Sequence, residues 1–307
     1  MGITNFPNGV SSFGIPLIGS GPILTTGTVR FVHAGTGGTN NDGQDPDRPL
    51  TTIDAAINLS TATSTTYAGQ DYIVVLPGHA ETISAGDGYD ADVAGITILG
   101  LGRASLRPTL TYSATGSTGV IGAAGVSVIN LLHVASVDAV VVMMPIGTSA
   151  GALVEANEFR DAGSIGIVDT MTIGAASDVT IRNNRWAETD AGIGQSCILG
   201  TTPTRLTLDG NHMDKDAQTG CIELGIALQL QIVNNFIETS APEDLCIVVA
   251  TTATGWIDNN KLRVADDAAN LTEAITIDND CQLGRNWIVN ANAQRVLEHN
   301  AVQSTDA

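Results

Sequence analysis

The sequence predicts an all-β chain wound as a parallel β-solenoid, and three periodic features support that prediction. Asparagines recur every 24–27 residues at Asn130, Asn157, Asn184, Asn211, Asn235, Asn260 and Asn286. An aliphatic residue stands three positions before each of the last six, and an apolar residue stands two positions after all seven. Such a period is typical of stacked supersecondary units, and the period-two alternation around each asparagine indicates strands.

Each repeat has room for two or three short strands, since no helix-length apolar stripe lies between the asparagines. A second apolar segment follows about ten residues after each asparagine, as at Cys197–Leu199 and Cys221–Leu224. Neighbouring strands lie ~4.8 Å apart, so about eight coils would build a rod of ~40 Å. The 307 residues are therefore expected to form one solenoid that grows by adding coils.

The asparagine column has a mechanical explanation. A solenoid needs a sharp corner once per coil, and asparagine tolerates the left-handed backbone conformation that such corners use. Its amide also carries both donors and acceptors, so stacked amides can bond to one another. All seven asparagines are therefore expected to form a structural ladder and not a ligand site, because buried polar groups must be paired.

Residues 1–30 break the repeat and are expected to form an extended N-terminal arm. The arm is too apolar for a typical disordered tail, which is highly polar, so we expect it to dock on another chain. Leu153 and Trp256 stand at an outward position that is polar in other coils, and they extend the predicted contact surface. The arm's contact candidates are Phe6, Val10, Phe13, Ile15 and Leu17.

Residues 31–60 are expected to form an opening loop followed by a capping helix at 49–59. Leu50, Ile53 and Ile57 recur at helical spacing, and Thr51 with Asp54 fits a helix start signal. A short amphipathic helix laid across the first coil would cover its open strand edges. Residues 61–300 would form the solenoid, and 301–307 a polar tail. The acidic loop at 42–47 is read as a turn and not as a calcium site.

The stacked asparagines resemble those of the right-handed parallel β-helix (pectate-lyase-like) superfamily, whose members include polysaccharide-cleaving enzymes, phage tailspikes and phage virion proteins. Pro49–Ile57 matches a P-x-x-T-I-x-x-A-I helix common at the start of such proteins, and Val75–Ile83 matches V-x-x-G-x-x-E-x-I. The resemblance implies a single-stranded right-handed β-helix. The opening Met1–Gly14 also resembles β-helix proteins encoded among phage head genes.

Composition narrows the possible partners. The net charge of −19, with only two lysines, lacks the basic stripe of a nucleic-acid groove. No apolar run approaches 18 residues, and Met1–Leu17 lacks the features of a secretion signal, so we expect a soluble protein made in the host cytoplasm. Cys197, Cys221 and Cys246 fall in one column and are expected to be reduced, buried thiols without a metal.

The sequence gives no reason to assign catalytic, cofactor-binding or metal-binding residues. The family's polygalacturonase strings Gly-His-Gly and Arg-Ile-Lys do not occur, and Arg160, Arg182 and Arg185 are more simply explained as surface ion-pair partners. Acids that follow the corners would form a solvated ridge, since turns do not provide the burial that perturbed sites need. That ridge contains Asp161, Glu188, Asp190, Asp214, Asp216, Glu238, Asp266 and Asp267.

These features together predict a structural virion protein, most specifically a capsid decoration (cement) protein on the outer head surface. Its partners would be the major capsid protein and itself, as the homotrimer that related phage β-helices suggest, with no nucleic acid or membrane partner. Two alternatives stay open: a tailspike-like or secreted polysaccharide lyase or hydrolase, and a glycan-binding fibre module that does not cleave.

Overall fold

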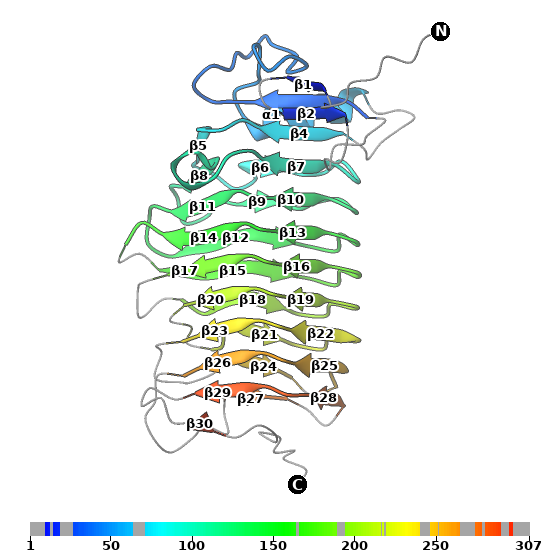
Figure 1. Ribbon diagram of the computed structural model, residues 1–307, viewed down its shortest axis with the longest axis vertical. Coiled ribbons are helices and arrows are strands. Elements are labelled where there is room, and N and C mark those ends of the chain that lie inside the picture. The colour runs from blue at the N-terminus through cyan, green and yellow to red at the C-terminus, as the bar shows by residue number, and fades with distance from the viewer. Residues whose placement is uncertain are drawn as a thin grey trace.

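The computed structural model has the shape of a rod made of stacked coils (Figure 1). It describes residues 10–12, 15–18, 27–63, 71–163, 166–188, 194–215, 217, 219–239, 246–250, 252–264, 274–277, 280–289 and 295–296. The predicted fold class is confirmed: the chain is mostly β, a parallel solenoid with one short α-helix. Its regular part, residues 127–289, makes about seven turns.

The first sheet has ten strands and runs the length of the rod. In spatial order it contains β3 (Val29–Val32), β4 (Tyr72–Val75), β7 (Thr97–Gly100), β10 (Ser127–Ile129), β13 (Leu153–Glu155), β16 (Thr180–Arg182), β19 (Thr207–Asp209), β22 (Leu230–Val233), β25 (Gly255–Asp258) and β28 (Cys281–Leu283). Ten strands at ~4.8 Å spacing span roughly 40 Å.

The second sheet also has ten strands, and all but the last follow a strand of the first sheet along the chain. It contains β5 (Ala80–Ile83), β8 (Thr109–Tyr112), β11 (Leu132–Ala135), β14 (Glu158–Asp161), β17 (Arg185–Ala187), β20 (His212–Asp214), β23 (Phe236–Glu238), β26 (Lys261–Arg263), β29 (Trp287–Val289) and β30 (Arg295–Val296). All of its pairings are parallel except the last, in which β30 turns back along β29.

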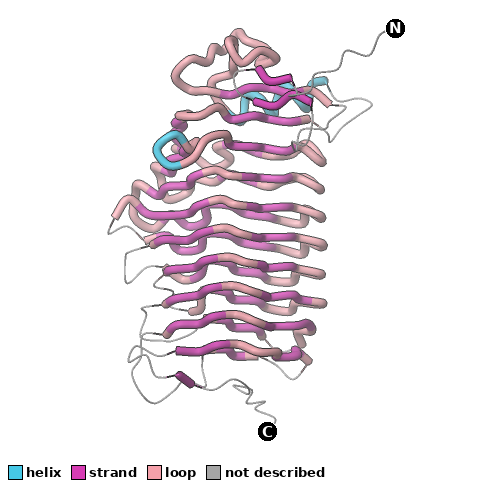
Figure 2. Tube along the Cα trace, in the orientation of Figure 1, coloured by secondary structure: helices cyan, strands magenta, loops and turns pink. Residues whose placement is uncertain are grey.

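The third sheet closes each turn. It contains β12 (Val140–Ile146), β15 (Ile167–Ile173), β18 (Ser196–Gly200), β21 (Ile222–Leu224), β24 (Ile247–Val249) and β27 (Ile275–Thr276). The short parallel pair β6 (Tyr89–Asp90) and β9 (Gly119–Val120) precedes it, and a bridge from Ile121 to Ile146 links the two. Figure 2 shows the three strand stacks in magenta.

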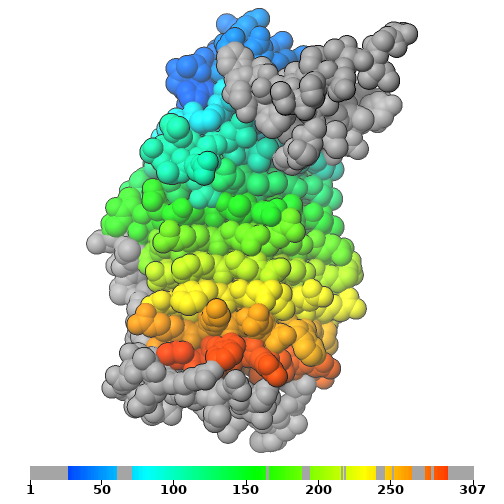
Figure 3. All heavy atoms as spheres, in the orientation of Figure 1, coloured from blue at the N-terminus to red at the C-terminus, as the bar shows by residue number. Residues whose placement is uncertain are grey.

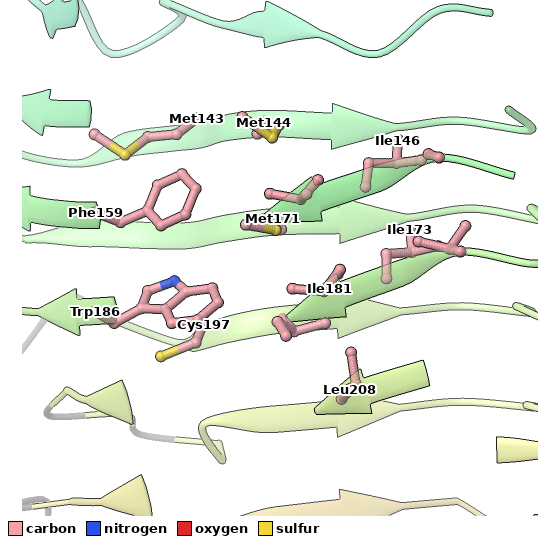
Figure 4. Packing of buried hydrophobic residues seen from close by; sticks show 14 of the residues in the cluster. Met143, Met144, Ile146, Phe159, Met171, Ile173, Ile181, Trp186, Cys197 and Leu208 are labelled. Carbon is pink, nitrogen blue, oxygen red and sulfur yellow. The ribbon is translucent and has the colours of Figure 1, made fainter. Parts of the chain in front are cut away.

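The core fills the space between the three sheets, and the inward side chains of successive strands stack on one another there. Phe159 and Trp186 stack with ring centroids 5.2 Å apart, and Met171 and Cys197 of the third sheet lie beside them (Figure 4). The aliphatic column three residues before the asparagines is buried as predicted from Val154 through Ile257, and Leu283 is partly buried against it. In Figure 3 the coils form successive coloured bands across one face.

The N-terminal end of the rod is covered by the opening loop and by α1 (Ile53–Thr63). The backbone of Leu50 exchanges hydrogen bonds with the outer edge of β3, donating to Phe31 and accepting from His33, both at 2.8 Å. Ile53 and Ile57 of α1 are buried in the core. The predicted cover for the first coil therefore exists, and it pairs the strand edge that would otherwise be open.

The helix itself begins later than predicted, at Ile53 instead of residue 49. Because Leu50 is held by β3, the helix cannot start before it. Thr52 takes the capping position expected for Thr51, since its hydroxyl accepts from the N–H of Ala55 at 3.1 Å. Glu81 of β5 accepts from the N–H of Ile53 at 3.1 Å and so ties the helix to the second sheet.

The described part of the N-terminal arm is a two-stranded antiparallel hairpin. It consists of β1 (Val10–Ser12) and β2 (Ile15–Ile18). In Figure 1 both strands lie at the same end of the rod as β4. These two segments of the predicted extended arm pair with each other, and β3, which begins at Val29, already belongs to the first sheet.

Candidate functional site

Six of the seven predicted asparagines form a continuous ladder between the first and second sheets. From Asn184 onward, each side-chain oxygen accepts from the backbone N–H and the side-chain amide of the asparagine one turn earlier. Each side-chain amide also donates to the backbone carbonyl of the aliphatic-column residue one turn earlier. For Asn184 these acceptors are Asn211 at 3.0 and 3.2 Å and Val154 at 2.9 Å. The ladder consists of Asn157, Asn184, Asn211, Asn235, Asn260 and Asn286.

Asn130 does not occupy the ladder position. The register of β10 on β13 places Asn130 beside Ala156 and Leu131 beside Asn157. Asn157 accordingly accepts from the N–H of Leu131 at 2.8 Å, while the Asn130 amide donates to Gly100 at 2.8 Å. The first line is therefore one residue out of step: Asn130 stands at the left-handed corner position, with a φ of 57°, and Leu131 occupies the place of a ladder asparagine.

The corner conformation also belongs to a different residue from the one predicted. The residue before each of the first five ladder asparagines has a positive φ, and the ladder asparagine does not. This left-handed position turns the chain, which leaves the following amide free to point inward to its neighbours. The corner residues are Ala156 (φ 56°), Asn183 (56°), Gly210 (65°), Asn234 (60°) and Asn259 (54°).

The outward face of the first sheet carries the two contact candidates from the solenoid itself. Leu153 is half-buried on β13, and Trp256 on β25 is 43% exposed. Their column is otherwise polar, since Gln231 and Gln282 flank Trp256 in register. The two side chains thus form apolar points on a flat, regularly spaced polar surface.

The other contact candidates belong to the N-terminal arm. Val10 is in β1, and Ile15 and Leu17 are in β2, where the backbone alone is described. Phe6 and Phe13 lie outside the described residues.

The predicted acidic ridge is not solvated along its whole length. Asp161 and Glu188 are buried, and the burial of Glu188 raises the pKa of its carboxyl group against the opposing effect of Lys215. Asp214 is exposed, and Glu238 pairs with Arg263. The remaining ridge acids, Asp190, Asp216, Asp266 and Asp267, lie outside the described residues.

Lys215 is a buried cation that the sequence did not reveal. Its ammonium group lies 3.0 Å from the carboxylate of Glu188 and donates to the carbonyls of Ile167 at 2.8 Å and Ser196 at 2.9 Å. Glu188 in turn accepts from the N–H of Ile167 at 2.6 Å. The pair joins the ends of second-sheet strands to the starts of third-sheet strands across three turns, so its first role is to close the wall of the solenoid.

The cysteine column is buried, as the sequence predicted. Cys197, Cys221 and Cys246 carry free thiols on adjacent turns. Burial raises the pKa of Cys197 well above its ordinary value, which favours the neutral thiol. Among the described residues, no group of three or more His, Cys, Asp or Glu side chains is arranged to hold a metal ion.

The arginines near the corners take part in surface ion pairs. Arg182 lies 2.9 Å from Glu155, and Arg160 and Arg185 lie 3.8 and 4.0 Å from Glu158. His79, near the N-terminal end, is buried and lies 3.0 Å from Glu81, which also holds the first turn of α1. These side chains all take part in structural contacts.

A groove opens on the outward face of the second sheet, toward the C-terminal end of the rod. Its volume is about 300 Å³. It is lined by Phe236, Lys261, Leu262, Arg263, Trp287 and Val289. This surface was not predicted from the sequence, although the apolar or basic residues one position after the asparagines on three successive turns indicate it.

Comparison with known proteins adds a likeness of fold. No family model and no curated protein matches the sequence. The fold is similar to that of PfbA, a surface adhesin of Streptococcus pneumoniae. The two share 14% identity with a TM-score of 0.42, over 86% of this chain and 80% of that one.

A search of the described helices for membrane spans finds none with the length and apolar character needed.

Proposed function

We propose that this protein is a structural component of a bacteriophage virion, a decoration (cement) protein that binds the outer surface of the head and stabilises it. The observation that carries the proposal is the apolar pair Leu153 and Trp256 on the flat outward face of the first sheet. A large exposed aromatic side chain on a rigid polar surface is a suitable anchor for a protein interface. Its partner would be the major capsid protein.

The solenoid has the mechanical properties that this role requires. The asparagine ladder ties consecutive turns by buried hydrogen bonds, and the three parallel sheets link each turn to the next. A decoration protein must hold neighbouring capsid subunits at a fixed separation, and a body braced in this way resists stretching and bending. The resemblance of Met1–Gly14 to β-helix proteins of phage head genes supports the same role.

The charge of the protein favours the outer surface. With a net charge of −19 it would be repelled by packaged DNA and by other acidic surfaces at low salt.

We propose that three copies associate side by side through their lateral faces and present their N-terminal arms to the head. Sedimentation of the purified chain should then give the mass of three copies.

The test uses heads purified without the protein and then incubated with it. The protein should sediment with the heads and raise the temperature or pressure at which they release DNA. Replacing Trp256 by Gln, the residue of its column neighbours, together with Leu153→Thr, should weaken head binding by about tenfold or more. Gln231→Ala, in the same column, is the matched control and should bind like the unaltered chain.

The same preparation separates the alternatives. Failure to bind heads or to protect them would overturn the proposal. Release of oligosaccharides from a host glycan would instead identify a lyase or hydrolase, and glycan binding without cleavage or head binding would identify a fibre module.

A further inference from the structure

The buried pair Glu188 and Lys215 consists of two groups that can react with each other. The exposed fractions of their side chains are 2% and 0%. Both residues directly follow the register pair Ala187 and Asp214, so they leave neighbouring turns side by side, one strand spacing of ~4.8 Å apart. The Nζ atom of Lys215 lies 3.0 Å from the Oε2 atom of Glu188. A nucleophile and an acyl group are thus held in contact away from bulk water.

Backbone carbonyls fix the orientation of the lysine amino group. Nζ donates to the carbonyl of Ile167 at 2.8 Å and to that of Ser196 at 2.9 Å, and a longer contact reaches Val168 at 3.3 Å. A neutral amine has two N–H bonds and one lone pair. The two short contacts can take both N–H bonds, which leaves the lone pair for the remaining close neighbour, the carboxyl group of Glu188.

The carboxyl group is placed to accept an attack. Its Oε1 atom accepts a hydrogen bond from the backbone N–H of Ile167 at 2.6 Å, on the side away from the contact with Lys215. A fixed backbone N–H at this atom stabilises the negative charge that develops when a nucleophile adds to the carboxyl carbon. Burial also raises the pKa of Glu188, so transfer of a proton from the ammonium to the carboxylate costs less here than in water.

We propose that Lys215 and Glu188 join in an intramolecular amide (isopeptide) bond after the chain folds. The ammonium first passes a proton to Oε2, and the neutral amine adds to the Cδ atom of Glu188. The Cδ–Oε2 bond then breaks, and Oε2 leaves as water with two of the three ammonium hydrogens. The third hydrogen stays on nitrogen as the amide N–H. Nothing is oxidised or reduced, and one positive and one negative charge disappear together.

The fold supplies the driving force that free groups lack. Oriented groups within one molecule react with effective concentrations that reach about 10⁵–10⁸ M. The reaction also removes two buried charges, whose desolvation costs free energy, and leaves a neutral amide beside carbonyl and N–H partners that are already in place.

The product would be a covalent link between two neighbouring turns. It would close a loop from residue 188 to residue 215 and so restrict the unfolded chain, as a disulfide does. This bond goes beyond the proposed head-binding role and does not depend on it, because the pair lies inside the wall of the solenoid. The two proposals can therefore fail separately.

The experiment is intact mass spectrometry of the full chain, recovered unfolded in urea and then refolded. The chain in urea should have the mass of its sequence, and freshly refolded chain should still hold the ion pair. On incubation the folded chain should become lighter by one water molecule, and it should keep that mass when it is unfolded again.

Trypsin locates the bond, because it does not cut after an acylated lysine. The peptide Trp186–Arg205 should appear joined to Leu206–Lys261, with the cut after Lys215 missing. Lys215→Arg keeps a positive charge, but its guanidinium stays protonated and is no nucleophile, so this variant should retain its full mass. Lys261→Gln, which changes the other lysine of the chain, is the matched control and should lose water like the unaltered chain.

Three results would overturn the proposal. The first is a full mass that persists after prolonged incubation of the folded chain. The second is a water loss that is already present in urea or that remains in Lys215→Arg, since it would arise at another site. The third is a water loss that maps to peptides other than the joined pair.

Discussion

The side-chain oxygen of Asn211 accepts two hydrogen bonds from Asn184, one from its backbone N–H at 3.0 Å and one from its side-chain amide at 3.2 Å. Asn211 donates its own two groups to Asn235 in the same way, each at 3.0 Å. Because every member both gives and receives, loss of one amide leaves donors unpaired on one neighbour and an acceptor unpaired on the other. Such buried polar chains stabilise only while they are complete.

Replacing Asn211 by Leu should therefore lower the free energy of unfolding by about 3 kcal/mol. The leucine fills a similar volume, so the loss reflects unpaired groups on Asn184, Asn235 and the carbonyl of Ile181 more than a cavity. Urea denaturation followed by circular dichroism measures the change.

The matched control is Asn234→Gly, at the corner one turn on. Asn234 has a positive φ of 60°, which glycine adopts freely, and its exposed side chain bonds to Asp209 and Asn259 at the surface. We expect a change within ~0.5 kcal/mol. Equal losses from the two variants would mean that the ladder contributes no more than a surface contact.

The fold could be predicted because the residues that repeat along the sequence are the ones that point into the core. The asparagines and the aliphatic residues three positions earlier repeat at nearly constant spacing, and a parallel solenoid is the architecture that stacks such positions. The column from Val154 to Ile257 is buried accordingly. Asn130 was misplaced because the spacing of asparagines alone does not reveal that it stands at the corner position, one residue before the ladder position that Leu131 occupies.

The less predictable features depend on which strands become neighbours. Lys215 and Glu188 are 27 residues apart, yet their contact partners Ile167 and Ser196 come from a third segment of each turn. No local pattern marks this meeting of the second and third sheets. The groove at Lys261 likewise arises from register across three turns.

Ala156 is a corner residue whose substitution should stabilise the protein. Its φ is 56°, a left-handed conformation that costs alanine roughly 1 kcal/mol and glycine almost nothing. The next three corners carry Asn183, Gly210 and Asn234 instead. Ala156→Gly should raise the free energy of unfolding by about 0.5–1 kcal/mol, measured as a higher urea midpoint at an unchanged slope.

The opposite result is expected at Ala187, in β17, which has ordinary strand geometry. Ala187→Gly should destabilise by about 0.5–1 kcal/mol, because glycine loses more freedom on folding. A loss of stability in Ala156→Gly as well would show that the corner is not strained.

Lys215→Met tests the buried ion pair. It removes the ammonium that neutralises Glu188 and leaves a carboxylate with little access to water, so we expect a loss of about 3–5 kcal/mol at pH 7. Adding Glu188→Gln should recover part of that loss, since an amide costs less to bury than a charge. Thermal unfolding of the two variants gives the comparison.

The loss in Lys215→Met should also depend on pH. Burial already raises the pKa of Glu188, and the lysine opposes that rise, so removing it raises the pKa further. A carboxyl whose folded pKa lies above its unfolded value binds more protons when folded, so its contribution to stability falls as pH rises through that interval. The deficit of Lys215→Met against the unaltered chain should thus be larger at pH 8 than at pH 5. A deficit that shrinks with rising pH would contradict this account.

His133 should make the protein sensitive to acid. Its ring is buried between Tyr112 and Phe159, stacked on Phe159 with centroids 4.6 Å apart, and its Nδ1 atom lies 2.9 Å from the Tyr112 hydroxyl. Burial lowers the pKa of His133 to about 3, with a smaller contribution from the positive charge of Arg107. The folded protein therefore keeps a neutral ring where the unfolded chain would take up a proton.

A histidine with a depressed pKa binds fewer protons in the folded state, so its contribution to stability is present above its unfolded pKa and is lost as pH falls from about 6.5 toward 3. Within that window the slope of the free energy of unfolding against pH approaches about 1.4 kcal/mol per pH unit.

To isolate the effect of His133, we compare Tyr112→Phe with the double variant Tyr112→Phe and His133→Phe, because the first change removes the hydroxyl that the second would leave unpaired. Both retain an aromatic ring in the stack above Phe159 and Trp186. Between pH 6 and pH 4 the free energy of unfolding should fall less steeply with falling pH in the double variant than in Tyr112→Phe. The difference in slope should approach the ~1.4 kcal/mol per pH unit that one proton contributes. Parallel curves would mean that His133 is protonated in the folded core, and that the stacked ring carries a charge.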